Sequence, residues 1–310
     1  MSTTYSVSID PDSEGYLGRE CPACEKYFKV VPGTGIDGEG EIPCVCPYCG
    51  TSAPSDHFWT KAQLEYAESV AFSQVVGELD KMLKRLERKP DPKAFISIGI
   101  KVEGKPVPIV YYRELDLEQR LTCDNCTLQY AIYGVFGFCP DCGVHNSQQI
   151  LVNNLSLTDQ LLALAENTEP EIGRKLAESA LADSIAAFDG FGREIAAVHS
   201  GQASKPKQAA SISFQNLKRA SEQVEELFGI DLSAPLDLTQ WEHVNRCFQK
   251  RHVFAHKMGV ADQHYVDRSG DDPSLVGRRL SVSPDEIRQL NASLSEIATR
   301  FASSLKPSAT

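Results

Sequence analysis

Four pairs of cysteines, each with two residues between its members, point most directly to chemistry in this 310-residue chain. A two-residue gap lets both sulfurs of a tight turn reach one metal ion, and zinc prefers four tetrahedral ligands. We therefore predict two structural Zn²⁺ ions, because a complete set of four cysteines leaves no open coordination position for a substrate. The predicted ligands are Cys21, Cys24, Cys46 and Cys49 for one ion, and Cys123, Cys126, Cys139 and Cys142 for the other.

The assignment of ligands leaves alternatives open. Cys44 could replace Cys46, although the second pair would then lose its two-residue gap, and His145 could stand in within the second set. The pairs could also combine across the two sets. Free or redox-active thiols are the competing interpretation, but four pairs at the same spacing favour metal in a reducing compartment.

A second group of reactive side chains lies in the segment 251–256, where Arg251 is followed by His252 and His256. Residues 239–258 predict one helix that begins with a capping box from Thr239 to Glu242. Its apolar residues recur at spacings of three, four and seven, namely Trp241, Val244, Phe248, Ala255 and Met258. This pattern places Arg251 near the middle of the apolar face, where an unpaired guanidinium is costly to bury.

Two explanations compete for such an arginine. It could pair with a buried acid, Asp189 or Asp183, for structure alone, or it could face a site at a seam between helices or subunits. The two histidines are four residues apart, a spacing that can also hold a metal ion. Histidine titrates near neutral pH, and a guanidinium can bind an oxyanion with two parallel hydrogen bonds.

Charge limits the classes of partner. The net charge of −11 gives no overall positive field, so nucleic-acid binding would need a local patch. The helix over 239–258 supplies one, and residues 81–89 carry a second basic cluster that is typical of a solvated helix face. Apolar runs are too short to span a bilayer and no signal peptide is evident, so we expect a soluble, cytoplasmic protein that does not enter membranes.

The cysteine segments resemble zinc ribbons, in which two turns at hairpin ends clamp one ion. We expect a multidomain chain: small four-cysteine zinc-ribbon β modules with a connecting helix, then an all-α helical bundle. The expected bounds are 1–55 for the first ribbon, 56–93 for the helix, 94–150 for the second ribbon and 155–305 for the bundle. Expected helices cover 61–88, 158–167, 170–198, 212–228, 239–258 and 284–304, and hairpins are expected near 33–40 and 94–113.

Two further patterns concern positions inside these elements. Ser283, Pro284 and Glu286 form a strong start signal for the last helix. Aromatic residues near the cysteine turns could stack on nucleobases or fill a small ribbon core; they are Tyr27, Phe28, Tyr48, Tyr130, Tyr133 and Phe136.

The helical half resembles HEPN domains, small helical bundles that commonly dimerise and often cleave RNA. Arg251 and His256 match the family's motif of arginine, four residues and histidine, with the polar His252 directly after the arginine. Residues 187–194 look like the family's first long helix, in which Asp189 is the acidic residue between apolar ones. The connection after the motif, 256–277, looks like the one that leads to the family's last helix, and the resemblance covers about residues 155–305.

This resemblance implies a metal-independent endoribonuclease that acts as a homodimer on an RNA substrate, with both motifs lining one cleft. Arg251 would grip the phosphate, His256 would be the general base or acid, His252 would support it, and Asp189 would orient Arg251 or a histidine. The architecture resembles bacterial toxins and anti-phage effectors, which implies an antitoxin or defence-system partner and zinc ribbons that recognise RNA or protein. The alternative is a non-catalytic adaptor that binds nucleic acid, nucleotide or protein.

Overall fold

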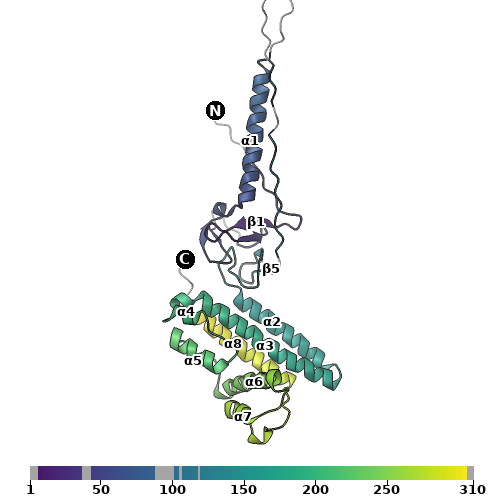
Figure 1. Cartoon of the computed structure of the whole chain (residues 1–310), viewed down its shortest axis with the longest axis vertical. Coiled ribbons are helices and arrows are strands. Elements are labelled where there is room, and N and C mark those ends of the chain that lie inside the picture. Colours follow the sequence, from purple (N-terminus) through teal and green to yellow (C-terminus); the bar gives the residue numbers. More distant parts are fainter. Residues whose placement is uncertain (1–5, 37–42, 88–100, 105–106, 118, 306–310) are drawn as a thin grey trace, which may run out of the picture. The chain divides into compact units, whose positions relative to one another are not determined.

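The computed structural model describes residues 6–36, 43–87, 101–104, 107–117 and 119–305. The chain divides into two compact units, Met1–Val144 and His145–Thr310, whose elements are labelled in Figure 1. The first unit contains β1 (Leu17–Glu20), β2 (Tyr27–Val30), β3 (Pro43–Val45), β4 (Ser52–Pro54), the 3-10 turn Ser55–Phe58, α1 (Lys61–Lys84), β5 (Gln119–Thr122) and β6 (Gln129–Ile132).

The two cysteine segments of the first unit share one antiparallel sheet with the strand order β1-β2-β6-β5. Each hairpin, β1–β2 and β5–β6, carries a cysteine pair at its turn, and the hairpins join where Lys29 pairs with Ala131 and Val30 with Tyr130. The strands β3 and β4 form a separate two-stranded sheet. The two predicted ribbons therefore contribute to one sheet, and the buried Phe28 and Tyr130 lie in a single core with the cysteines.

Helix α1 begins as its sequence predicts but is shorter. Thr60 caps it, with Gln63 completing a capping box, and the helix ends at Lys84, four residues before the predicted end. The hairpin predicted over 94–113 is not formed by its described residues: 101–104 and 107–117 contain no strand, and the remainder lies outside the described residues, as does the second half of the predicted 33–40 hairpin. A side chain of α1 bonds to the backbone of this segment instead: the amide of Val110 donates to Ser69 Oγ at 3.0 Å.

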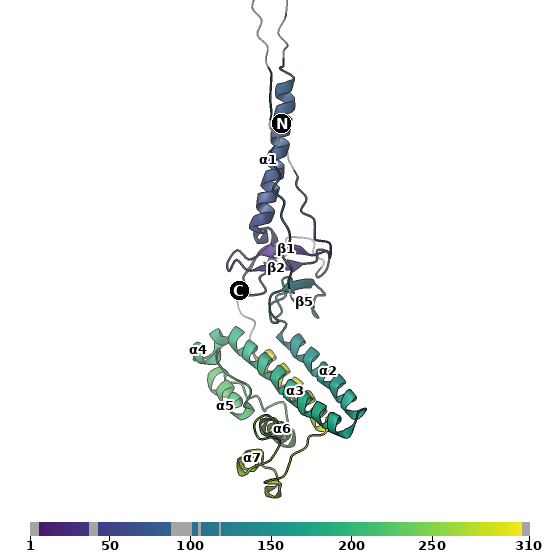
Figure 2. The ribbon, with the colours of Figure 1, turned by 45° about the vertical axis from the view of Figure 1, so that its right-hand side comes forward.

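The second unit is helical. Its elements are α2 (Ser147–Glu166), α3 (Pro170–Val198), the 3-10 turn Ser200–Gln202, α4 (Pro206–Ala209), α5 (Leu217–Phe228), α6 (Leu238–His256), α7 (Gln263–Ser269), the 3-10 turn Pro273–Leu275 and α8 (Pro284–Ser304). Figures 1 and 2 show α2 and α3 side by side along much of their length, and α8 packs against both and against α6. The start signal at Ser283, Pro284 and Glu286 is confirmed as a capping box.

Three helical predictions need correction. Helix α2 begins at Ser147, eleven residues before the predicted 158, and buries Leu151 and Leu155 in the main core. Helix α5 begins at Leu217, after an Asn216 cap, and not at 212. The predicted connection after α6 contains a further short helix, α7, capped by Asp262. Of the helices in the described ranges, none combines the length and the apolar character needed to cross a bilayer.

Candidate metal centres and a basic helix face

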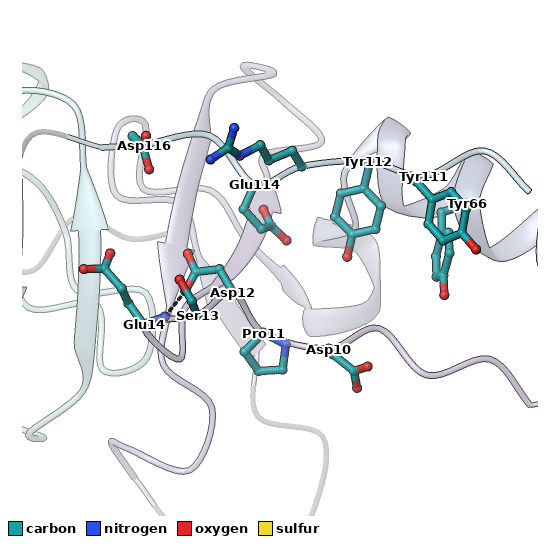
Figure 3. A pocket seen from close by; sticks show the side chains of 11 residues that line it. Asp10, Pro11, Asp12, Ser13, Glu14, Tyr66, Tyr111, Tyr112, Glu114 and Asp116 are labelled. Carbon is teal, nitrogen blue, oxygen red and sulfur yellow. Dashed lines mark hydrogen bonds between the residues drawn. The ribbon is translucent and has the colours of Figure 1, made fainter.

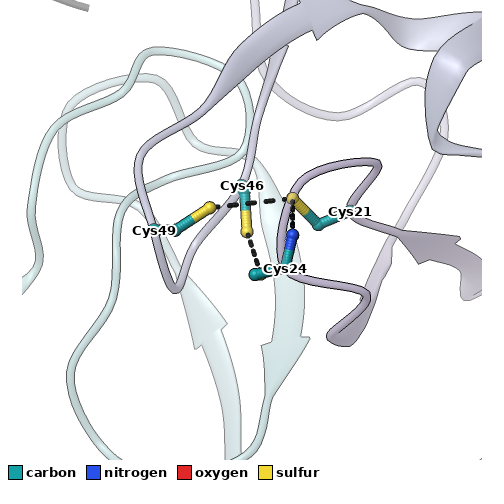
Figure 4. Close-up of side chains that lie close together, drawn as sticks. All are labelled: Cys21, Cys24, Cys46 and Cys49. Atoms are coloured by element: carbon teal, nitrogen blue, oxygen red, sulfur yellow. Dashed lines mark hydrogen bonds between the residues drawn. The ribbon is translucent and has the colours of Figure 1, made fainter.

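Each cysteine set converges on one point. In the first set the sulfurs of Cys21 and Cys49 are 3.7 Å apart, as are those of Cys24 and Cys46 (Figure 4). In the second set the corresponding distances are 3.6 Å and 3.5 Å. A tetrahedral ion with metal–sulfur bonds of about 2.3 Å places its sulfurs about 3.8 Å apart, whereas a disulfide needs about 2.05 Å. Both sets fit a four-coordinate ion.

All four cysteine turns have the same backbone geometry. The residue after the second cysteine donates its N–H to the carbonyl of the first cysteine at 2.9–3.0 Å and adopts a left-handed φ between 56° and 71°. These four residues are Glu25, Gly50, Thr127 and Gly143. Glycine adopts this conformation at little cost, whereas a β-branched residue such as Thr127 is strained by about 1 kcal/mol or more. A metal ion bound by the turn would offset that strain.

The open alternatives for the ligands are settled by position. Cys44 is buried on β3 but is not a member of either four-sulfur group, and each set gathers its own two pairs. His145 lies in the second unit, where its Nε2 is 3.3 Å from a Glu194 carboxylate oxygen. Burial raises the pKa of the Cys126 thiol to about 12, so a metal must deprotonate this thiol on binding.

Most of the aromatic residues near the turns are structural. Phe28 and Tyr130 are fully buried, and Phe28 packs edge-on against Phe58 with ring centres 5.9 Å apart. Tyr48 donates its hydroxyl to the carbonyl of Tyr27 at 2.8 Å and accepts from the amide of Tyr133 at 2.9 Å. The core-filling interpretation is therefore the correct one for Phe28 and Tyr130.

Helix α6 departs from its predicted start and burial. Its cap is Asp237, with Gln240 completing the box, so the predicted box from Thr239 to Glu242 is wrong. The first half buries Val244, Cys247 and Phe248 in the main core. The second half instead buries Val253, which packs in a small separate cluster with Ala261, Tyr265, Val266 and Leu280. Nine residues at 100° each separate Val244 from Val253, so the buried face turns through about 180° along the helix.

This rotation changes the position of Arg251. The prediction placed it in the middle of a continuous apolar face, but the side chain is only partly buried, and Ala255 and Met258 on the expected face are exposed. Arg251 forms no ion pair with any described residue, so pairing with Asp189 or Asp183 is not its role. The buried cation of α6 is Lys250, which sequence analysis missed. Its Nζ lies 2.6 Å from Glu286 Oε1 and 3.0 Å from the Ser281 carbonyl oxygen.

His252 and His256 come together at the exposed end of α6. Their ring centres are 4.8 Å apart, and both side chains are exposed. Burial and then the positive charges of His256, Lys257, His264 and Arg251 lower the pKa of His252 below its usual value. Among the residues that the structure describes, no third histidine, cysteine or carboxylate joins them to form a metal site. The two imidazoles therefore lie on the surface beside positively charged side chains.

Asp189 supports the fold and does not orient Arg251. Its buried carboxylate accepts from the amide of Phe214 at 2.6 Å and from Arg193 Nε at 3.0 Å. One turn later Gly192 lies against the Phe214 ring so closely that a Cβ would come within 2.5 Å of it. Asp189 and Gly192 thus hold the loop before α5 against α3, which explains the acidic residue between apolar ones.

A hollow of about 400 Å³ in the first unit is lined by carboxylates and tyrosines (Figure 3). Its carboxylates are largely engaged. Asp12 accepts from Lys29 Nζ at 2.8 Å, and Glu114 accepts from Gln63 Nε2 at 2.9 Å and from the Tyr27 hydroxyl. These bonds attach the segment 107–117 to the sheet and to α1, so the hollow has a structural explanation.

The burial of Lys250 could have been inferred from the sequence. Cys247, which counts as apolar, lies three residues before it, and Val253 lies three residues after it, so Lys250 occupies a position between two buried ones at helical spacing. The sequence contains no signal that the C-terminal end of α6 is exposed, because that exposure depends on how α7 packs against the helix. Comparisons of the chain with protein-family models, with curated proteins and with solved structures returned no match.

Proposed function

We propose that this protein is a metal-independent endoribonuclease whose site is the exposed end of α6. The observation that carries the proposal is the pair of exposed imidazoles, His252 and His256, 4.8 Å apart and beside an arginine that has no structural partner among the described residues. Cleavage by the ribose 2′-hydroxyl needs a proton acceptor, a proton donor and a cation for the charge on phosphorus. These three residues supply those groups.

The local electrostatics agree with this assignment. Arg251, Lys257 and His264 make the surroundings of His252 positive in a protein whose net charge is −11. Lys257 is paired with Asp262, so Arg251 is the cation best placed to bind a phosphate with two hydrogen bonds. The lowered pKa of His252 keeps its imidazole neutral at pH 7, which is the form that accepts a proton.

The proposed enzyme acts as a homodimer through its helical unit, as the resemblance to HEPN domains implies. In one chain the motif lies on an open surface next to Met258, which is 84% exposed directly after the helix. A second copy on this surface would cover Met258, exclude water and provide a second motif. The same resemblance supports a role as a toxin or anti-phage effector restrained by a partner protein.

The proposed metal is zinc, one ion in each four-cysteine set. Four thiolates at tetrahedral spacing suit zinc and leave no position for a substrate. The ions would hold the hairpins of the first unit in place, and that unit would recognise RNA or a partner protein.

The test is cleavage of RNA by the full-length protein in EDTA, with zinc content measured after the reaction. Arg251→Ala and His256→Ala should each lower the rate at least 100-fold, or about 2.7 kcal/mol, while folding and association persist. Full activity in both variants would exclude this site. Absence of cleavage in the wild type on any RNA would favour the adaptor function, with which the acidic net charge agrees.

A further inference from the structure

We propose that one face of α6 selects the base beside the cleaved phosphodiester, and that it accepts a base with an exocyclic amino group, adenine or cytosine. This selection rests on the proposed ribonuclease site, because the same face carries His252 and His256. Two carboxamide side chains, Asn245 and Gln249, extend the face toward the start of the helix. They are the specificity-determining residues of the site.

The carboxamides and the imidazoles form one strip along the helix. At 100° per residue the members of this α6 strip fall within an arc of about 60°, and each is exposed or partly exposed: Asn245, Gln249, His252 and His256. Residues three or four apart on a helix have Cβ atoms about 5–6 Å from each other. Gln249 therefore lies next to His252, and Asn245 lies next to Gln249.

The other sides of α6 are covered by the rest of the helical unit. Phe248 packs edge-on against Phe188 of α3 with ring centres 6.4 Å apart, and Val253 packs in the small cluster with residues of α7. His243 faces α8, where its Nε2 is 2.9 Å from the Glu286 carbonyl oxygen. Phe248 and Val253 lie about 70° to either side of the middle of the strip, and His243 lies about 150° away. The α6 strip therefore faces outward.

The carboxamides present more acceptors than donors. Asn245 Nδ2 donates to the Trp241 carbonyl at 2.8 Å, which turns the nitrogen back onto the helix and leaves Oδ1 to accept from a ligand. The Gln249 side chain has no hydrogen-bond partner among the described residues, so its oxygen and its nitrogen are both available. The strip thus offers two amide oxygens and one amide nitrogen beside the imidazoles.

This set of groups matches a base that carries an amino group next to a ring nitrogen. The amino group of adenine or cytosine donates two hydrogens, and the neighbouring ring nitrogen accepts one. Guanine and uracil have a carbonyl oxygen in place of that amino group, which would meet the two amide oxygens with no hydrogen between them. Unpaired acceptors in a site discriminate more strongly than a missing contact does. Single-stranded RNA exposes the base edges that such recognition requires.

The charges along the helix limit the contact to one or two nucleotides. Arg251 and His264 supply positive charge at the His252 end of the strip, which suits the scissile phosphate. Glu242 is exposed one turn before Asn245, and its carboxylate repels a phosphate at that end. Gln249 lies only about 4.5 Å along the helix axis from His252, so a base beside the scissile phosphate can reach it.

The experiment uses full-length, zinc-loaded protein and short RNAs with 2′-O-methyl groups at all positions but one, so that a single phosphodiester can be cleaved. All four bases are tested on each side of it. At one of these two positions, the wild type should cleave the adenine and cytosine versions at least tenfold faster than the guanine and uracil versions. Gln249→Leu should bring this ratio to within about twofold. Gln249→Arg offers donors only and should shift the preference to guanine.

The matched control is Gln289→Arg, an equal charge change at an exposed residue of α8, which should keep the wild-type ratio. Circular dichroism verifies the fold of each variant. Cleavage without a base preference in the wild type, or an unchanged preference in Gln249→Leu, would overturn the proposed selection and leave the ribonuclease standing.

Binding separates this selection from the ribonuclease itself. The same RNAs with a 2′-deoxy group at the single site cannot be cleaved, and fluorescence anisotropy measures their affinity at constant salt. If the wild type cleaves none of the RNAs, tenfold tighter binding of the adenine and cytosine versions that is lost in Gln249→Leu would support the selection and refute the ribonuclease. Equal binding of all four versions, or no binding, would then refute both.

Discussion

Replacement of Lys250 by methionine should destabilise the helical unit, whereas the same replacement of Arg251 should not. Lys250 is the buried cation of α6: its side chain is 10% exposed and its ammonium group bonds to the Ser281 carbonyl and to Glu286. Methionine keeps the apolar stem but removes both bonds. Arg251 is partly exposed and has no ion pair with the described residues, so its loss removes no such contact.

The loss of stability in Lys250→Met depends on which polar groups lose their hydrogen-bond partner. A buried carbonyl that loses its donor costs about 1–3 kcal/mol, and the carbonyl of the exposed Ser281 costs less because water can replace the donor. Removal of one partner from a buried ion pair costs about 3–5 kcal/mol. Because the Glu286 side chain is 33% exposed and keeps the Ser283 amide as a donor, water recovers much of the second cost. We expect about 2 kcal/mol for Lys250→Met and at most about 0.5 kcal/mol for Arg251→Met.

The assay is thermal unfolding of the full-length protein, followed by the helical circular dichroism signal. Lys250→Met should lower Tm by about 4–8 °C and Arg251→Met by about 1–2 °C. Burial opposes ionisation of Glu286, but the hydrogen bonds from Lys250 and Ser283 and the charge of Lys250 together outweigh it and lower the pKa of that carboxyl. The contribution of the pair is therefore present at neutral pH and is lost as pH falls below about 4. Equal Tm losses in the two variants at pH 7 would refute this account of α6.

Further predictions concern the metal turns and the histidine pair. Cys126→Ser should lower the metal content from two ions per chain to one, whereas Cys44→Ser should retain both, as elemental analysis would show; equal losses would contradict the ligand sets. Thr127→Gly should stabilise the first unit by about 0.5 kcal/mol and Gly143→Ala should destabilise it by about 1 kcal/mol, measured by denaturant unfolding with zinc present. Because the pKa of His252 is lowered, the acid limb of the pH–rate profile should have its midpoint below about pH 6.5, and a midpoint above about 7 would argue against His252 as the proton acceptor.

The parts of the structure that depend on local signals were predictable from the sequence. The cysteine spacing predicts which two sulfurs share a turn, since each pair needs only its own turn to bring two ligands together, whereas the fold decides which two pairs meet. The cap at Ser283 is read from the residues that make it, and the predicted start of α1 at Lys61 is confirmed. At α6 two possible capping boxes overlap, one that begins at Asp237 and one that begins at Thr239. Only tertiary packing selects between them, so the prediction of Thr239 was wrong.

The errors arise where distant segments meet. Pairing of β2 with β6 joins residues about a hundred positions apart, and no local pattern in either strand specifies that partner. The prediction for α6 assumes a single buried face along the helix. In the structure Val253 packs against α7 on the opposite side, so Arg251 lies at the edge of the buried face and is only partly buried. Asp189 has the residue type of a catalytic acid, and only the fold shows that the Phe214 amide uses its carboxylate.

The most direct test of the proposed function compares the wild type with His256→Ala on total cellular RNA in EDTA. His57→Ala, which removes an exposed histidine of the first unit, is the matched control. The proposal predicts fragments with 2′,3′-cyclic phosphate ends from the wild type and the control, and at least a 100-fold lower rate for His256→Ala. Equal cleavage by all three proteins, or 3′-hydroxyl ends that appear only with added divalent metal, would contradict it.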